Sequence, residues 1–342
     1  VLLNLSTENY TAFVQDGYLS VYLLGLVPCV LITGPAKAAM KYITRNYARD
    51  EHVWLWSDFL GAMKANWKQG FLSDAVYDAL APELKAVVAF GIGYNSANLS
   101  AATAHGVYVC NVPNYCLEEV AVHVVALIMA EQRRMPNLIK WIEDGKWGGG
   151  YKAIAPVRRF SCSTVGLYGF GRIARYVAKM LSGFGCRVIA YDAIVSAESI
   201  REAGVEPVDF DTLLAESDYL TLHVPLLPST EGIFNRDAFQ KMKPTAILVN
   251  TARGALCNPD DLYDALTTGK IYGAAIDAYI TEPPAGVERK ILELPNVLST
   301  PHVGYYSDDA FNELIEQTVD VAIHVLKNED PGTLINRELW KQ

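Results

Sequence analysis

The sequence predicts an α/β protein built on parallel sheets, and three of its features support this prediction. Strand-like apolar runs alternate with helical patterns along most of the 342 residues, which is typical of parallel strands with helices on both faces of a sheet. A glycine-rich turn at residues 169–174 joins one such strand to one such helix. Three polar residues, Arg253, Glu282 and His302, each follow a later apolar run. The length suggests about two domains.

The predicted strands are short apolar runs bounded by turn residues. They span residues 27–33, 86–90, 107–110, 164–168, 187–191, 219–223, 246–250, 273–276 and 297–299. Helical patterns cover residues 117–134, 172–184 and 308–327, and the glycine-rich segment 145–155 is predicted to be a surface loop.

The composition predicts a soluble, cytoplasmic enzyme that binds neither nucleic acid nor a membrane. The formal charge is −9, with 38 acidic and 29 basic residues, so no basic face is available to neutralise phosphates. The six cysteines lack C-x-x-C spacing, which predicts reduced core thiols and neither a disulfide frame nor a metal site. Residues 17–36 are uncharged and could be mistaken for a membrane span, but Gly17, Gly25, Pro28 and Gly34 interrupt them. Residues 1–24 have no functional assignment.

The turn at residues 169–174 has the G-x-G-x-x-A spacing of a dinucleotide fingerprint. Gly169 allows a tight turn, and Gly171 lets the backbone approach a pyrophosphate. Arg172 and Ile173 begin a helix whose free N–H groups favour phosphate. Such a turn can also be a nonfunctional glycine turn, but the flanking strand and helix supply the context that the fingerprint requires.

Asp192 ends the next strand, where an acidic side chain can accept hydrogen bonds from the adenosine ribose. No Arg or Lys follows before Arg201, so a 2′-phosphate would meet an uncompensated carboxylate. The sequence therefore predicts NAD rather than NADP as the cofactor.

Arg253 lies just after the strand at 246–250, at the strand end where open α/β sheets place their ligands. Its planar guanidinium suits a carboxylate held by two parallel hydrogen bonds. The alternative is a surface arginine paired with Asp260 or Asp261.

Asp277 and Glu282 follow the strand at 273–276, and His302 follows the strand at 297–299. Asp277 could accept a hydrogen bond from a nicotinamide carboxamide, and Glu282 could orient an imidazole and stabilise its protonated form. His302 could protonate a carbonyl as hydride arrives, or take the proton of a hydroxyl in the reverse direction. The alternatives are an ordinary acidic loop before two prolines and a structural histidine.

Several ordered motifs resemble those of the D-isomer-specific 2-hydroxyacid dehydrogenases, over about residues 83–336. They are residues 165–173, 222–226 with Thr230, 249–254, Asp277 with 282–283, and 300–302. The resemblance implies an NAD-dependent oxidoreductase that transfers a hydride between NAD(H) and a 2-oxo acid / D-2-hydroxy acid pair. Such an enzyme is a D-2-hydroxyacid dehydrogenase, or 2-oxoacid reductase.

The resemblance also implies roles for single residues. Arg253 would hold the substrate carboxylate and carbonyl oxygen, His302 would be the proton donor or acceptor, and Glu282 would be its partner. The backbone at Ile92 and Gly93 would meet the substrate carboxylate. The residues implied to bind NAD are Gly169, Gly171, Arg172, Ile173, Asp192, His223, Val224, Pro225, Thr230, Thr251, Ala252 and Asp277.

Two domains follow from the resemblance, with Rossmann-like and flavodoxin-like parallel sheets and an active site in the interdomain cleft. The substrate domain would comprise residues 1–112 and 302–342, and the NAD-binding domain residues 113–301. A homodimer is implied, formed through the helix at 117–134 and neighbouring elements.

Within the family, residues 110–113 and 302–307 look closest to the branch that includes the carboxy-terminal-binding-protein-like dehydrogenases. Tyr305 would then line the substrate pocket and favour an apolar or aromatic 2-oxo acid over pyruvate or glyoxylate. Two alternatives remain. One is an NADH-sensing corepressor-like binding protein with weak or no catalysis, and the other is an inactive homologue, because residues 54–84 lack the strand that the family carries there.

Overall fold

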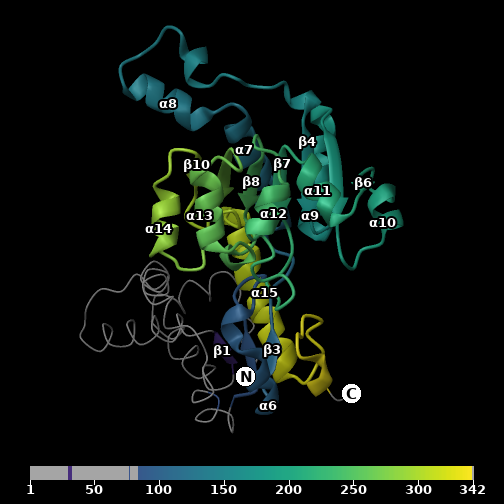
Figure 1. Ribbon diagram of the computed structural model, residues 1–342. Helices are drawn as coiled ribbons and strands as arrows, with labels where there is room; N and C mark the ends of the chain where they lie inside the picture. The colour runs from purple at the N-terminus through teal and green to yellow at the C-terminus, as the bar shows by residue number, and fades with distance from the viewer. Residues whose placement is uncertain (1–29, 33–76, 78–83, 341–342) are drawn as a thin grey trace, which may run out of the picture. The chain divides into compact units, whose positions relative to one another are not determined.

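The computed structural model describes residues 30–32, 77 and 84–340, and the chain divides into two compact units (Figure 1). Unit 1 comprises Val1–Tyr115 and Phe311–Gln342, and unit 2 comprises Cys116–Ala310. The predicted domain boundaries after residues 112 and 301 differ from these divisions by a few residues at the first crossing and nine at the second. The assignment of substrate and cofactor to the two domains stays a prediction.

Unit 2 is built on a seven-stranded sheet in which all neighbouring strands are parallel. The strands are β4 (Thr164–Tyr168), β5 (Arg187–Tyr191), β6 (Glu206–Pro207), β7 (Tyr219–Leu222), β8 (Ile247–Asn250), β9 (Gly273–Ile276) and β10 (Val297–Ser299). Their order is β10-β9-β8-β7-β4-β5-β6. The strand order therefore reverses between β4 and β7, and the carboxyl ends of strands at such a switch point form the binding crevice of an open α/β sheet. The predicted parallel α/β architecture is confirmed.

Helices cover both faces of this sheet because successive side chains of a strand point to opposite faces. Ile247 and Val249 belong to the core that packs against α7, α9 and α10, whereas Leu248 belongs to the core against α11, α12, α13 and α14. The helix bounds are α7 Leu117–Gln132, α9 Arg172–Leu181, α10 Ala197–Glu202, α11 Phe210–Glu216, α12 Arg236–Lys241, α13 Pro259–Thr267 and α14 Val287–Leu292.

The structure differs from the sequence prediction after the helix α7. The helix expected over residues 117–134 ends at Gln132, and α8 (Met135–Glu143) follows after Arg134, whose φ of 51° breaks the helical backbone. Figure 1 shows α8 held away from the sheet. The loop predicted over 145–155 includes a short 3-10 turn at Gly150–Ala153.

The described part of unit 1 contains a parallel sheet in the order β1-β2-β3. Its strands are β1 (Val30–Ile32), β2 (Ala86–Val88) and β3 (Tyr108–Cys110), and its helices include α6 (Leu99–Ala104) and most of α15 (Asp308–Leu326). The Asn336 side chain accepts a hydrogen bond from the Val109 N–H at 2.8 Å and donates one to the Val107 carbonyl at 2.9 Å. These bonds tie the carboxy-terminal segment to β3.

Some sequence predictions lie outside the described residues. They concern the extension at 1–24 and, apart from Tyr77 and Leu84, the segment 54–84. None of the helices in the described ranges is long and apolar enough to cross a membrane. The prediction of core cysteines is wrong for Cys162, which is exposed, whereas Cys110 and Cys257 are buried.

Candidate active site

The glycine turn follows β4 at the switch point of the sheet. Gly169 has a φ of +93°, and a Cβ atom there would lie 2.7 Å from Val224 Cγ1 and 3.0 Å from the backbone of His223. Gly169 is therefore required for the close approach of this turn to the end of β7. A Cβ atom at Gly171 would meet none of the described atoms within 4 Å. Packing against these atoms therefore does not explain why residue 171 is a glycine.

Gly171 is also the N-cap of α9, and no described side chain caps this helix end. The first N–H groups of a helix have no partner within it, and the helix dipole adds positive potential there. An open glycine beside the N-terminus of a ten-residue helix fits the pyrophosphate of a dinucleotide.

The carboxylate of Asp192 lies against the same turn. Its Oδ2 accepts a hydrogen bond from the Phe170 N–H at 2.6 Å, and its Oδ1 accepts from the N–H groups of Ile194 and Val195 at 2.8 and 2.9 Å. These bonds fix Asp192 at the end of β5, beside the glycine turn, as the fingerprint requires.

His223 and Thr230 flank the loop after β7. Burial lowers the pKa of His223 to about 3, so its imidazole is neutral, and its Nε2 lies 3.2 Å from Thr221 Oγ1. The Thr230 hydroxyl donates to the Pro225 carbonyl at 2.7 Å and accepts from the Leu227 N–H at 2.9 Å. Thr230 therefore shapes this loop.

The turn after β8 is built by Asn250, whose side chain is buried. Its Nδ2 donates to the Arg253 carbonyl at 2.8 Å and its Oδ1 accepts from the Ala252 N–H at 3.1 Å. Within this turn the Thr251 hydroxyl is buried and has no hydrogen-bond partner among the residues that the structure describes. A buried polar atom without a partner is costly, and this one fits a contact with the predicted cofactor.

Arg253 lies at the carboxyl end of β8, and its Nη1 donates to the Ala252 carbonyl at 2.6 Å. Asp261, one of the two alternative partners, accepts a hydrogen bond from the backbone N–H of Arg236 at 3.1 Å. A Cβ atom at Gly254 would lie 2.3 Å from the backbone nitrogen of Ile280. The turn that carries Arg253 therefore packs directly on the loop that leads to Glu282.

Asp277, directly after β9, is buried and extensively hydrogen-bonded. Its carboxylate accepts from Thr300 Oγ1 at 2.5 Å and from the N–H groups of Val303 and Gly304, each at 3.0 Å. Burial would raise the pKa of Asp277, but these bonds and the contact with His123 lower it to about 2. The carboxylate is thus ionised throughout the working range of an enzyme, and the structure uses it to hold the turn that contains His302.

His302 and Glu282 form the central pair of the site. His302 Nδ1 lies 2.7 Å from Glu282 Oε1, and both side chains are half-buried. Because the carboxylate accepts the Nδ1 proton, Nε2 is the ring nitrogen that can exchange a proton with a substrate. The ring of Tyr305 lies edge-on to that of His302 at 6.4 Å, and burial raises the pKa of this phenol.

Glu288 in α14 positions the loop of Glu282, a role that was not predicted. Its buried carboxylate accepts hydrogen bonds from the N–H groups of Ile280 and Thr281 at 2.7 and 2.9 Å and from the Thr281 hydroxyl at 3.0 Å. In the sequence, only the positions of Arg253, Glu282 and His302 after apolar runs were apparent. A glutamate within a short helix carries no signal of a bond to a loop seven residues earlier.

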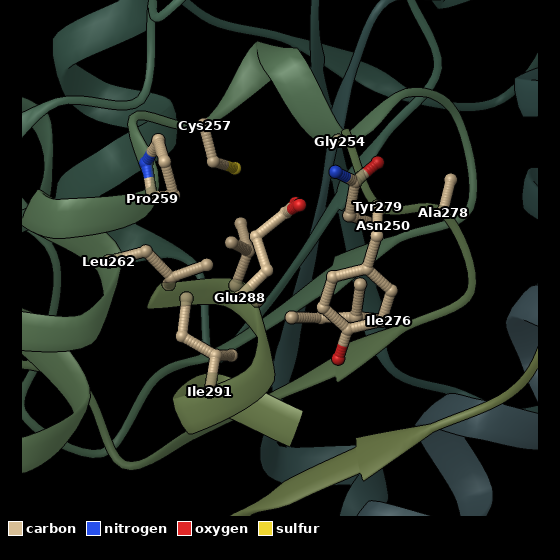
Figure 2. A pocket seen from close by; sticks show the side chains of 11 residues that line it. Asn250, Gly254, Cys257, Pro259, Leu262, Ile276, Ala278, Tyr279, Glu288 and Ile291 are labelled. Atoms are coloured by element: carbon tan, nitrogen blue, oxygen red, sulfur yellow. The ribbon is translucent and has the colours of Figure 1, made fainter. Parts of the chain in front are cut away.

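The cavity in Figure 2 is lined by Asn250, Gly254, Cys257, Tyr279 and Glu288, among others. The Glu288 carboxylate points into it (Figure 2). Its volume of about 20 Å³ is enough for about one water molecule. This cavity is therefore a packing gap and not the site of a cofactor or a 2-oxo acid.

Ile92 and Gly93 belong to unit 1, in the loop after β2. The Asn111 side chain donates to the Ile92 carbonyl at 2.8 Å, and the Val112 N–H donates to the Gly91 carbonyl at 3.0 Å. These bonds shape the loop within unit 1. Arg253, Glu282 and His302 all belong to unit 2, where His302 and Glu282 are in direct contact.

The chain matches known proteins over most of its described length. Residues 125–304 match the family model described as D-isomer specific 2-hydroxyacid dehydrogenase, NAD binding domain. A second model, DUF624, described as a protein of unknown function, matches residues 13–77.

Individual relatives agree with the first match. A glyoxylate reductase from Korarchaeum cryptofilum is 35% identical over 78% of this chain and 81% of its own length. A hydroxypyruvate reductase from Thermotoga maritima is 38% identical over 66% of this chain and 72% of its own length. The crystal structure of D-lactate dehydrogenase from Aquifex aeolicus, complexed with NAD and lactic acid, has a TM-score of 0.73 and 28% identity, and the match covers 78% of this chain and 84% of that one.

Proposed function

Because this chain belongs to the D-isomer specific 2-hydroxyacid dehydrogenase family, we propose that Arg253, Glu282 and His302 are the residues with which it acts on its substrate. The family places it among NAD-dependent oxidoreductases that transfer a hydride between 2-oxo acids and 2-hydroxy acids. The specificity for D-hydroxy acids and the individual residue roles are our proposal. The observation that supports it most is the 2.7 Å contact between His302 Nδ1 and Glu282 Oε1.

In this proposal His302 is the general acid and base. Glu282 holds the Nδ1 proton and so fixes the tautomer and the ring orientation. Nε2 donates a proton to the carbonyl oxygen during reduction and accepts it from the hydroxyl during oxidation. The negative charge of Glu282 stabilises the imidazolium that exists before the proton is given away.

Arg253 binds the substrate carboxylate and the carbonyl oxygen through its planar guanidinium. The backbone at Ile92 and Gly93 is proposed to meet the same carboxylate. The proposed NAD contacts are the backbone of Gly169 to Ile173 for the pyrophosphate, Asp192 for the ribose, and Thr251 with its neighbours for the nicotinamide end. When bound, NAD supplies or accepts the hydride.

The substrate class is a 2-oxo acid, and Tyr305 supports a preference for one with an apolar or aromatic side chain. Its ring lies next to that of His302, and its raised pKa keeps the phenol neutral, so it adds no negative charge against a carboxylate substrate. Glyoxylate and hydroxypyruvate are the competing candidates, because relatives named for these activities are 35% and 38% identical over the matched regions. The relation to the carboxy-terminal-binding-protein branch stays a prediction.

We propose that the homodimer forms through α8, a neighbour of the helix predicted for this role. The apolar side chains of α7 such as Val124 and Ile128 are buried in the core of unit 2. In contrast, Ile139 and Ile142 in α8 and Trp147 just beyond it are 53%, 57% and 85% exposed, and clustered apolar exposure of this kind would suit a protein interface. A cytoplasmic location also stays a prediction.

The test is NADH oxidation by the purified protein with a panel of 2-oxo acids: glyoxylate, hydroxypyruvate, pyruvate and phenylpyruvate. NADPH is run in parallel. Turnover with NADH that falls by about a thousandfold or more in Arg253→Ala, with unchanged NADH binding by tryptophan quenching, supports the proposal. Normal kcat/KM in that variant would contradict the role of Arg253. Tight NADH binding without turnover on any acid would favour the corepressor-like alternative.

A further inference from the structure

The turn that carries His302 has a strained backbone. His302 has a φ of 53°, a left-handed conformation that is uncommon for a residue other than glycine. Of the four described non-glycine residues with positive φ, only His302 lies in the candidate active site. Such a conformation persists only where surrounding contacts enforce it.

Asp277 supplies these contacts on both sides of His302. It accepts the Thr300 hydroxyl two residues before the histidine, and the N–H groups of Val303 and Gly304 directly after it. Packing is equally tight, because a Cβ atom at Gly304 would lie 3.0 Å from Asp277 Oδ2. The carboxylate therefore fixes the backbone from which the imidazole projects.

His123 completes this arrangement from α7. Its Nε2 lies 3.0 Å from Thr300 Oγ1 and 3.5 Å from Asp277 Oδ1. A hydroxyl has one proton, and Thr300 donates it to Asp277. Thr300 must therefore accept from His123, whose Nε2 carries a proton. The order of donation is His123 to Thr300 to Asp277, and it ends at the turn of His302.

We propose that His123 and Thr300 are positioning residues for His302, acting through Asp277. This inference rests on the proposed function of His302 as the proton donor. His123 orients the Thr300 hydroxyl, the hydroxyl orients the Asp277 carboxylate, and the carboxylate holds the N–H groups that place the imidazole. Neither His123 nor Thr300 needs to touch the substrate for this role.

The experiment compares two matched pairs of variants in the full-length enzyme. Thr300→Val removes the hydroxyl and keeps the shape, whereas Thr300→Ser keeps the hydroxyl. His123→Leu removes the donor, whereas His123→Gln keeps an N–H₂ donor near the Nε2 position. The control for losing a buried hydroxyl is Thr318→Val, since Thr318 donates to the Leu314 carbonyl in α15, outside this site.

We expect kcat to fall about tenfold or more in Thr300→Val and His123→Leu, because small displacements of a catalytic group are costly. KM for NADH should stay within about twofold, since the glycine turn is untouched. Thr300→Ser and His123→Gln should recover most of kcat, and Thr318→Val should leave it unchanged. Hydrogen exchange of the peptide that contains residues 302–306 should be faster in the two damaging variants and normal in the two conservative ones.

The outcomes distinguish the positioning inference from the proposed function of His302. If His302→Ala is inactive but Thr300→Val and His123→Leu keep full kcat and normal exchange, the positioning inference is overturned and the proposed function stands. If kcat falls equally in the conservative and the damaging variants, the loss of a hydrogen-bond donor is not the cause of the fall. The inference is then also overturned. If His302→Ala itself keeps full activity, the proposed function fails, and the exchange measurement alone then decides whether His123 and Thr300 hold the turn.

Discussion

The glycine turn and the acid–base site lie at the same edge of one sheet but are specified in different ways. The glycine turn is a property of six consecutive residues, and its geometry depends on backbone and missing side chains. The acid–base site depends on side-chain hydrogen bonds between residues as far apart as His123 and Thr300, which 177 positions separate. A cofactor site can thus be local in the sequence, while the group that moves the proton depends on distant elements.

The largest expected effect is on the proton donor. His302→Ala should lower kcat about a thousandfold, because general acid catalysis contributes about 10²–10⁴-fold. Glu282→Gln should lower it about a hundredfold, because the amide cannot stabilise the imidazolium. Steady-state kinetics with NADH and the best 2-oxo acid measure both.

The matched control is His324→Ala, an exposed histidine of α15 whose Nδ1 lies near the Asp320 carbonyl. It should keep wild-type kcat. A Glu282→Gln enzyme with full activity would contradict the paired role of Glu282 and His302. The acid–base site would then not depend on this side-chain contact.

The glycine turn offers a pair of substitutions that separate folding from binding. Gly169→Ala should destabilise the protein by about 3 kcal/mol, because of its positive φ and the clash with Val224. Gly171→Ala should leave the melting temperature unchanged, since its Cβ atom has room, but weaken NADH binding about tenfold by obstructing the pyrophosphate. Thermal unfolding and tryptophan quenching measure the two effects, and equal loss of stability in both variants would contradict this division.

Asp277→Asn tests the electrostatics of the network. The folded pKa of about 2 lies below the ordinary aspartate value of 3.8, so the ionised carboxylate contributes about 2 kcal/mol of stability above pH ~4. This contribution is lost as the pH falls from about 4 to about 2. The difference in unfolding free energy between wild type and variant should therefore shrink over that interval, as denaturant titrations at several pH values can measure. A difference in unfolding free energy that stays constant down to pH ~2 would show that the charge of Asp277 is not the cause of the difference.

The smallest effect is expected at Glu288. Glu288→Gln replaces one acceptor oxygen by a donor that faces donors of Thr281, so the Glu282 loop should loosen and kcat should fall about threefold to tenfold. Glu293→Gln is the control, because this residue of similar chemistry pairs with Arg289 on the surface. Equal activity of the two variants would remove Glu288 from the positioning network.

The sequence was sufficient for the sheet of unit 2 because its strands are apolar runs of the right length between turn residues. Only β6, two residues long, was missed. The helix α8 escaped prediction because the break before it depends on the positive φ of Arg134, which the sequence does not signal. Strand ends also located Arg253, Glu282 and His302, since parallel strands present their carboxyl ends at one edge.

The network around His302 could not be read from the sequence. His123 lies within an apolar helix, where a histidine is most often structural, and Glu288 has the pattern of a surface residue. Their roles depend on which strand ends neighbour one another, and that follows only from the order of strands in the sheet. Asp277 is an example of a residue whose role the sequence could not fully predict. A nicotinamide contact for it stays a prediction, whereas the structure shows that its carboxylate organises the turn beyond β10.

The shifted pKa values of Asp277 and His223 have a consequence for enzyme kinetics in ordinary buffers. Asp277, with a pKa of about 2, keeps its negative charge, and His223, with a pKa of about 3, stays neutral. Neither changes its charge between about pH 5 and pH 9. The activity profile across that interval therefore carries no contribution from a change of charge at Asp277 or His223.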